Sequence, residues 1–390
     1  MTFMKIKYDY IICGAGLSGL ILANKIFEDP DFDKKQILIL EKNLSNPINK
    51  TWCFWEKKNS LWDDYVIKSW DKLLFNSPNF KNETFLSDYS YKMIKSEFFI
   101  KSILQKIRNS KNFKIIEDDV LEFNESKDQV IVKTKSNKYF SNQVLNSVVN
   151  IEKIKSESSF PFLLQHFLGW TIETEHDFFD DNKATIMDFS IDQNNETRFF
   201  YVLPISRNKA LIEFTIFSKK LLKKKNYDIE LNKYLSNLNL FKYNIVEKEF
   251  GVIPMTCHPF ENSNTDRILN IGTAGGWTKP SSGYTFKYID KNTDKLIVSL
   301  KNNISFSKIS FKSRHWVYDL ILLDVLFYKN YLGSVLFTKM FSNNSMKKIF
   351  SFLDNESSLF EELKIASSFP KVIFTKSLLR NLGKILKYYL

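Results

Sequence analysis

Residues 8–26 read YDYIICGAGLSGLILANKI and decide the fold of the N-terminal region. A short apolar run leads into a glycine-rich turn, and apolar side chains recur at helical spacing after the turn. The three glycines have different roles, because Gly14 permits the tight bend, Gly16 lets the backbone approach a pyrophosphate, and Gly19 lets the helix pack on the sheet. The stretch therefore predicts a strand, a phosphate-binding turn and a helix.

A second apolar strand, QILILEK, follows at residues 36–42 and carries an acid near its end. Glu41 lies 22 residues after Gly19, a spacing at which an acidic side chain binds the hydroxyls of an adenosine ribose. Strand, turn, helix, strand and acid together predict a dinucleotide-binding domain. FAD and NAD share this half of the pattern, so the choice between them depends on a second segment.

Residues 267–286, RILNIGTAGGWTKPSSGYTF, supply that segment. A strand runs into a glycine-rich turn, which lets backbone amides approach a ligand, and we expect a helix to start near Ser281 and Ser282. An ordinary strand-to-helix connection is the alternative interpretation. The residues expected to contact the cofactor are Gly14, Gly16, Gly19, Glu41, Gly272, Thr273, Ala274, Gly275 and Gly283.

The charge of the chain is strongly basic, with 56 Lys and Arg against 44 Asp and Glu in 390 residues and a formal charge of +12. Such a balance suits nucleic acid or an anionic membrane surface. Lys, Asn, Ile, Phe and Tyr are all frequent, as expected of an AT-rich genome, so part of the basicity reflects codon usage. No basic run is combined with an RNA-binding or helix-turn-helix pattern, and we expect no nucleic-acid partner.

Cysteine and histidine are sparse: three Cys lack CxxC spacing, and four His form no HxxxH or HExxH motif. We therefore expect neither a disulfide nor a metal site, and a reducing compartment. The chain opens without a signal-peptide layout, and it contains no run of about 18 uncharged apolar residues. These features predict a soluble or peripheral protein.

Strand patterns predominate between the two glycine-rich segments. Residues 113–148 alternate like a strand hairpin around KSNK, and residues 163–217 contain four strand-like runs, the last two joined by a turn at 206–209. After residue 300 the pattern is helical. We predict an α/β fold in which a Rossmann-like domain carries an inserted antiparallel sheet and a helical C-terminal region. The expected segments are 1–50, 93–150 and 261–300 for the nucleotide-binding domain, 51–92 for a substrate-side segment, 151–260 for the sheet, and 301–390 for the helices.

One strand, ALIEFTIF at residues 210–217, places a carboxylate in an otherwise apolar segment. Alternation puts Glu213 on one face with Leu211, Thr215 and Phe217, and neither face is polar enough for solvent. Burying an unpaired charge is costly, so Glu213 must find a partner, stay protonated or line a cavity. A strand edge or a partnered structural glutamate is the alternative interpretation.

Seven short motifs follow one another along the chain: TWCFWE (51–56), LLQHFLGWTIET (163–174), IMDF (186–189), YVLP (201–204), ALIEFT (210–215), IPMT (253–256) and GTAGGWTKPSSGYTF (272–286). In this order they resemble the landmarks of the lycopene cyclase family of bacterial type, over residues 8–300 and more loosely through the helical tail. One departure is Ser190, because the family more often follows MDF with Arg.

The resemblance implies a flavoprotein of the glutathione-reductase type that closes the ends of linear, lipid-dissolved lycopene to give β-carotene. It also implies a non-redox ring closure that uses reduced FAD, with NAD(P)H as the electron donor. The family implicates the strand glutamate, here Glu213, in acid–base chemistry. Asp188 is either a second acid or a hydrogen-bonded strand end. Trp170, Tyr201 and Trp277 are either cation-stabilising aromatics or core residues.

Two other functions are compatible with much of this pattern. An FAD-dependent monooxygenase acting on a polyene or aromatic substrate shares the fold and the opening motif, but Thr273 stands where those enzymes usually carry Asp. A non-catalytic flavoprotein that binds carotenoids is the third interpretation, and the intact Glu213 argues against it.

Residues 375–390, TKSLLRNLGKILKYYL, predict an amphipathic helix. Such a helix suits contact with the membrane that dissolves the substrate, while packing on the protein itself is the alternative. KKLLKKK at 219–225 is a second candidate contact. We expect a cytoplasmic protein that is peripheral on the inner face of the cell membrane. The expected basic stripe is Lys376, Arg380, Lys384 and Lys387, opposite Leu378, Leu382, Ile385 and Tyr389.

Overall fold

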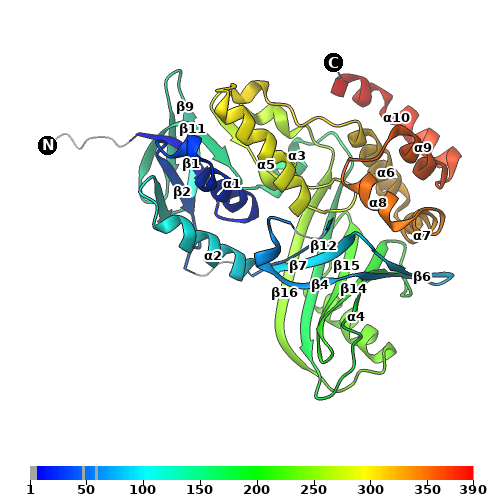
Figure 1. The fold of residues 1–390 in the computed structure, drawn as a ribbon. Coiled ribbons are helices and arrows are strands. Elements are labelled where there is room, and N and C mark those ends of the chain that lie inside the picture. The colour runs from blue at the N-terminus through cyan, green and yellow to red at the C-terminus, as the bar shows by residue number, and fades with distance from the viewer. Residues whose placement is uncertain (1–6, 46–48, 58–59, 390) are drawn as a thin grey trace.

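A computed structural model describes residues 7–45, 49–57 and 60–389 of the chain (Figure 1). Its N-terminal sheet has the order β8-β2-β1-β11-β10-β9, with β17 paired to β11. Strands β8, β2, β1, β11 and β17 run parallel, and β9 and β10 add an antiparallel hairpin. The bounds are β1 (Lys7–Cys13), β2 (Ile37–Glu41), β8 (Phe113–Glu117), β9 (Val120–Glu125), β10 (Val130–Thr134), β11 (Lys138–Asn146) and β17 (Ile268–Asn270).

Strand β1 lies in the middle of this sheet. Both of its faces are apolar, as expected for a parallel strand covered on both sides. Ile12 and Ile39 are fully buried in the core that contains residues of the helices, whereas Ile11 and Leu38 are fully buried against Val130 of the hairpin side. The helices packed around this core are α1 (Leu17–Glu28), α2 (Ser96–Arg108) and α5 (Phe286–Lys301). The predicted Rossmann-like domain is therefore confirmed.

The inserted sheet is also present, but it is mixed and not wholly antiparallel as expected, because β13 pairs in parallel with β5, and β5 and β6 come from the 51–92 segment. It has seven strands in the order β16-β12-β15-β14-β13-β5-β6. The four expected runs form β12 to β15, and the turn between Ser206 and Lys209 joins the last two. The bounds are β5 (Lys72–Ser77), β6 (Phe80–Phe85), β12 (Phe162–Glu173), β13 (Lys183–Asp188), β14 (Thr197–Ser206), β15 (Lys209–Ser218) and β16 (Asn244–Thr256).

Helices cover both faces of this sheet, as the apolar pattern of residues 210–217 predicts. Ile212 and Phe214 face a core shared with α4 (Lys224–Asn237), and Leu211 and Phe217 face a core shared with the C-terminal helices. A small sheet, β3-β7-β4, lies beside it (Figure 1). The remaining bounds are β3 (Thr51–Lys57), β4 (Val66–Trp70), β7 (Tyr89–Lys95), α3 (Ile151–Glu157), α6 (His315–Lys329), α7 (Gly333–Asn343), α8 (Met346–Leu353), α9 (Leu359–Ser367) and α10 (Lys371–Tyr389).

Residues 315–343 are long and apolar enough to cross a membrane by length and composition alone. They fold, however, as α6 and α7, which pack against strands of the large sheet. Helix α6 also carries Asp319 and Asp324, both buried and both paired with cations of other segments. We therefore interpret this segment as part of the protein core.

The second glycine-rich segment differs from the prediction in where its helix begins. Helix α5 starts at Phe286, not near Ser281 and Ser282. Gly276 and Gly283 have φ of +73° and +72°, the left-handed region that interrupts a helix. The residues between them form a turn instead, because the Gly283 N–H donates to the Lys279 carbonyl at 2.9 Å.

A buried ion pair ties this turn to the C-terminal helices. The Lys279 side chain is fully buried, and its Nζ lies 3.0 Å from Asp319 Oδ2 of α6. Lys279 also donates to Asn355 Oδ1 at 2.9 Å, and Ser281 donates to Asp319 Oδ1 at 2.5 Å. Every charge in this cluster thus has a close partner, as buried charges require.

We predict that Lys279→Met lowers the free energy of unfolding by about 3–5 kcal/mol, because it leaves Asp319 buried without its cation. Urea unfolding followed by circular dichroism measures the change. The control is Lys279→Met with Asp319→Leu, in which both charges are removed, and this double variant should recover most of the loss. If the double variant is as unstable as the single one, the ion pair is not the source of the effect.

Candidate active site

A cavity of about 440 Å³ opens where the two glycine-rich segments meet. Its lining contains predicted residues that lie more than 250 positions apart in the sequence, such as Gly14 and Gly272. Gly19, Ala274, Gly275 and Gly283 lie outside its lining. The predicted residues in its wall are Gly14, Gly16, Glu41, Gly272 and Thr273.

The first glycine-rich turn is built so that backbone rather than side chains faces this cavity. Gly14 has φ of +100°, and an added Cβ would lie 2.2 Å from Ser147 Oγ. An added Cβ at Gly16 would meet no atom within 4 Å among the described residues. Glu41 is joined to the same turn, because its Oε2 accepts from the Ala15 N–H at 2.8 Å. The N-terminus of α1 therefore borders open space beside an acid.

The second segment closes the cavity from the other side. Gly272 has φ of +60°, and a Cβ there would lie 2.7 Å from Ser18 Cβ at the start of α1. Gly19 packs just as closely, since its Cβ would lie 1.9 Å from the Gly14 carbonyl oxygen. The glycines outside the wall serve packing: a Cβ at Gly283 would lie 2.1 Å from Gln165 Oε1.

A row of residues crosses the large sheet next to this cavity. In the strand register, Glu213 of β15 is opposite Gly169 of β12, and Gly169 is opposite Glu249 of β16. Tyr201 of β14 is opposite Glu213 on its other side. Directly opposed residues of antiparallel strands point to the same face, so these side chains share one face. Gly169 lies between the two glutamates in this row, and Leu211 Cδ1 would lie 2.9 Å from a Cβ added at Gly169.

Glu213 is a carboxyl group that resists ionisation. Burial, reinforced by the neighbouring Glu249, raises its pKa to about 8, and the hydrogen bond from Thr215 opposes the shift. Thr215 Oγ1 donates to Glu213 Oε1 at 2.7 Å. Glu213 is half-buried, and packed cores cover the sheet on both of its faces at this position. Desolvation is therefore the dominant effect.

Glu249 was not found by sequence reasoning, although it lies just before the IPMT motif. It lines the 440 Å³ cavity and is 5% exposed. Its Oε1 accepts from the Thr51 N–H at 2.8 Å, whereas its Oε2 has no hydrogen-bond partner among the described residues. Burial raises the pKa of Glu249. A second carboxyl group thus stands at the boundary between the cavity and Glu213.

Three tyrosines surround the row on the side of the C-terminal core. Burial raises the pKa of Tyr201 and of Tyr91 well above the usual value, and raises that of Tyr284 to about 12. The charge of Glu213 contributes to the shifts of Tyr201 and Tyr284. The tyrosines therefore stay neutral at physiological pH and present rings and hydroxyl groups, not charges.

Asp188 lies on the opposite face of the sheet and does not share a site with Glu213. Its Oδ2 accepts from the Tyr234 hydroxyl of α4 at 2.7 Å, and its Oδ1 accepts from Asn76 Nδ2 at 3.0 Å. The Ser190 N–H also donates to Oδ1 at 2.9 Å. This contact uses the backbone of residue 190, so it does not depend on whether Ser or Arg stands there. Of the two expectations for Asp188, the hydrogen-bonded strand end fits this geometry.

The three predicted aromatic residues lie in different parts of the structure. Trp170 is opposite Ile212 and lies in the core on the α4 side. Trp277 is 1% exposed and packs edge-on against Phe311 in the core of the N-terminal domain. Only Tyr201 lies beside Glu213.

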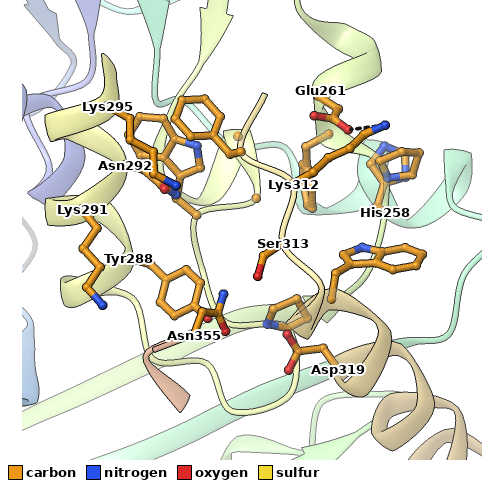
Figure 2. A pocket seen from close by; sticks show the side chains of 18 of the residues that line it. His258, Glu261, Tyr288, Lys291, Asn292, Lys295, Lys312, Ser313, Asp319 and Asn355 are labelled. Carbon is orange, nitrogen blue, oxygen red and sulfur yellow. Dashed lines mark ion pairs between the residues drawn. The ribbon is translucent and has the colours of Figure 1, made fainter. Parts of the chain in front are cut away.

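A larger cavity of about 510 Å³ lies on the far side of the second glycine-rich segment (Figure 2). Lys291 and Lys295 of α5 line one side, and Glu261 and Lys312, 3.7 Å apart, line the other. Of the residues predicted to contact the cofactor, Gly275 alone is in its wall, and the predicted aromatic Trp277 also lines it. Its charges are mixed, so we place the candidate active site at the smaller cavity, which contains the motif residues.

Solved structures share this architecture at low sequence identity. A geranylgeranyl bacteriochlorophyll reductase-like protein from Thermoplasma acidophilum matches with a TM-score of 0.60 and 12% identity, over 96% of this chain and 99% of that one. A flavoprotein/dehydrogenase from Cytophaga hutchinsonii matches with a TM-score of 0.61 and 11% identity, over 97% and 100%. A mutant of the halogenase PltM in complex with FAD matches with a TM-score of 0.60 and 11% identity, over 93% and 86%. No curated protein sequence matches significantly.

The sequence profile described as "Lycopene cyclase protein" matches residues 9–379, nearly the whole chain. The match includes both glycine-rich segments, the large sheet with its carboxyl groups and most of the C-terminal helices. This chain therefore belongs to the lycopene cyclase family.

Proposed function

We propose that this protein is a lycopene β-cyclase that holds FAD between its two glycine-rich segments and converts linear lycopene to β-carotene. The observation that supports this most directly is the placement of Glu213, a carboxyl group with a pKa of about 8, beside the motif-lined cavity. A polyene substrate is dissolved in lipid, so the proposed place of action is the inner, cytoplasmic surface of the cell membrane.

The cavity suits FAD on features of this chain. Backbone faces the space at Gly16, the N-terminus of α1 offers N–H groups for a pyrophosphate, and Glu41 is placed for ribose hydroxyls. Reduced FAD would supply an electron-rich ring that stabilises positive charge, with NAD(P)H as the proposed donor that keeps it reduced. The PltM structure with the same fold is a complex with FAD.

The chain's own residues suit acid catalysis away from water. The Glu213 carboxyl gives its proton to a terminal alkene of lycopene, the neighbouring alkene attacks the tertiary cation and closes the ring, and a ring proton returns to the Glu213 carboxylate. The proton is restored, so the reaction is an isomerisation. Thr215 restrains one Glu213 oxygen, and an aromatic face such as Tyr201 stabilises a nearby cation by about 0.5–2 kcal/mol.

Expression in a host that accumulates lycopene, followed by chromatography of the pigments, tests the proposed function. Cyclised carotenes are the expected products. Oxygenated carotenoids would support the alternative, an FAD-dependent monooxygenase, and unchanged lycopene in cells that contain the flavin-loaded protein would support a binding protein.

We predict that Gly16→Val abolishes flavin binding while the protein stays folded, because the side chain enters the space left for the pyrophosphate. Flavin absorbance per mole of purified protein and the thermal midpoint are the two measurements. Gly383→Ala is the control, since an added Cβ at Gly383 also meets no atom within 4 Å among the described residues. Full flavin absorbance in Gly16→Val would exclude this turn as the pyrophosphate site.

We predict that Glu213→Gln retains flavin but lowers cyclisation by about 10²–10⁴-fold, the range for loss of a general acid. The amide keeps the shape of the side chain and cannot deliver the proton. β-Carotene formed per bound reduced flavin is the measurement. Glu173→Gln is the control, because Glu173 lies on the same sheet and pairs with Lys209 at 2.7 Å at the surface. Turnover near wild type in Glu213→Gln would remove Glu213 from the mechanism.

A further inference from the structure

Helix α10 packs on the protein through polar residues as well as through apolar ones such as Phe374 and Ile385. Ser377 and Asn381 are each 1% exposed, and Ser377 Oγ donates to the Ile321 carbonyl of α6 at 3.1 Å. Arg380 reaches the buried Asp324 at 3.0 Å. The side of a surface helix that faces the protein is usually its apolar side. In α10 the polar contacts lie inside, and leucines are left outside.

The exposed apolar residues of α9 and α10 form a group, which we call the leucine face. The most exposed member, Phe360, has 86% of its surface accessible. The predicted stripes are only partly correct, because Ile385 packs inward and Lys384 donates to the Ser159 carbonyl at 2.8 Å. The leucine face consists of Leu359, Phe360, Leu363, Val372, Leu378, Leu379, Leu382, Leu386 and Tyr389.

Basic residues accompany this face. Lys364 of α9 and Lys371, Lys376 and Lys387 of α10 are exposed. Helix α10 contains no acidic residue, and Glu362 of α9 is buried against Arg314 at 2.7 Å. Apolar side chains with Lys beside them match the surface of an anionic bilayer, which takes up both. The helix lies at the edge of the molecule (Figure 1).

An apolar cavity of about 200 Å³ begins at the leucine face. Leu378 belongs to both, since it is 38% exposed and lines the cavity. The inner wall contains Ser281 and Ser282 of the second glycine-rich segment. Two residues further, Tyr284 packs against the core that contains Tyr201, the residue opposite Glu213 in the sheet. The wall also contains Asp319 and Glu362, which are paired with Lys279 and Arg314. The rest of the wall is mainly apolar and includes Phe337, Met340, Phe352, Ile365, Ala366 and Phe374.

We propose that the leucine face docks on an anionic lipid bilayer and that the cavity beneath it is the port through which an end of the polyene passes from lipid toward Glu213. This rests on the proposed cyclase function. The port lets an apolar chain leave the bilayer between α9 and α10 without crossing water.

The experiment uses the full-length, flavin-loaded protein with lycopene-containing vesicles of phosphatidylcholine and phosphatidylglycerol, and separately with lycopene in detergent micelles. Leu379→Asp with Leu386→Asp should lower vesicle flotation by about tenfold or more, and cyclisation in micelles should persist. Phe241→Asp is the control, because Phe241 is 72% exposed outside the leucine face. Ala366→Trp should fill the port and lower cyclisation in vesicles while flotation stays normal.

Wild-type flotation of the double Asp variant, or wild-type cyclisation by Ala366→Trp in vesicles, would overturn the proposed port. Failure of the proposed function itself looks different. In that case the wild-type protein forms no cyclised product in vesicles or micelles, whatever its flotation.

A separate observation concerns Glu249. Its Oε2 is buried, has no hydrogen-bond partner among the described residues, and belongs to a carboxyl group that faces Glu213 across Gly169. We infer that Glu249 is a positioning residue whose negative charge keeps the catalytic proton on Glu213. The other groups that act on the pair are Thr51, Cys53, Lys95, Tyr201, Thr215, Glu247 and Tyr284.

The direction of the effect follows from the charges. A neighbouring negative charge disfavours ionisation of Glu213, so Glu213 stays protonated below its pKa of about 8 and activity falls as pH rises through that value. Without the charge of Glu249 the pKa of Glu213 drops. The alkaline limb of the cyclisation rate should then begin at lower pH.

We predict that Glu249→Gln retains FAD and moves this alkaline limb downward by about one pH unit. Glu249→Ala should move it in the same direction, because it also removes the negative charge beside Glu213. Glu173→Gln is the control, since Glu173 lies on the same sheet and pairs with Lys209 at 2.7 Å at the surface. An unmoved limb in both variants, with lower rates at every pH, would mean that Glu249 has only a structural role.

Discussion

Desolvation of a carboxyl group is the interaction on which the proposed active site depends. Burial disfavours the ionised form of a carboxyl group, and the middle of a sheet covered on both faces reduces its contact with water. The core shared with α4 and the core shared with the C-terminal helices supply the two covers of Glu213. The strand register then places Glu249 two strands away on the same face, where its charge acts on Glu213.

Strand pairing and close packing decide where the two glycine-rich segments meet beside the large sheet. Pairing of β1 with β11 and of β11 with β17 brings the two glycine-rich segments to the same edge of a parallel sheet. Gly272 and Ser18 then approach so closely that only glycine fits. Glu249 reaches the wall of the resulting cavity from the long strand β16, so one side chain borders both the cavity and the row.

Ion pairs of buried aspartates organise the C-terminal region. Lys279 and Asp319 join the second glycine-rich segment to α6, and Arg380 and Asp324 join α6 to α10. Because these polar contacts use the inner side of α10, its leucines are left at the surface. The helices therefore cover the large sheet and leave an apolar surface above the small cavity, an arrangement that suits a substrate dissolved in lipid.

Local patterns in the sequence determined the Rossmann-like turn, the four strands of residues 163–217, the two apolar faces around Glu213 and the helical C-terminal region, because side chains two to four positions apart set these periods. Tertiary structure alone decided which residues share a site. Strand register put Glu249 and Gly169 in one row with Glu213 and turned Asp188 and Trp170 to the opposite face. Two left-handed glycines moved the start of α5 to Phe286, and the partners of Ser377 and Arg380 on α6 decided which side of α10 faces outward. These outcomes depend on contacts between residues far apart in the chain. The spacing of apolar residues within one segment does not record such contacts.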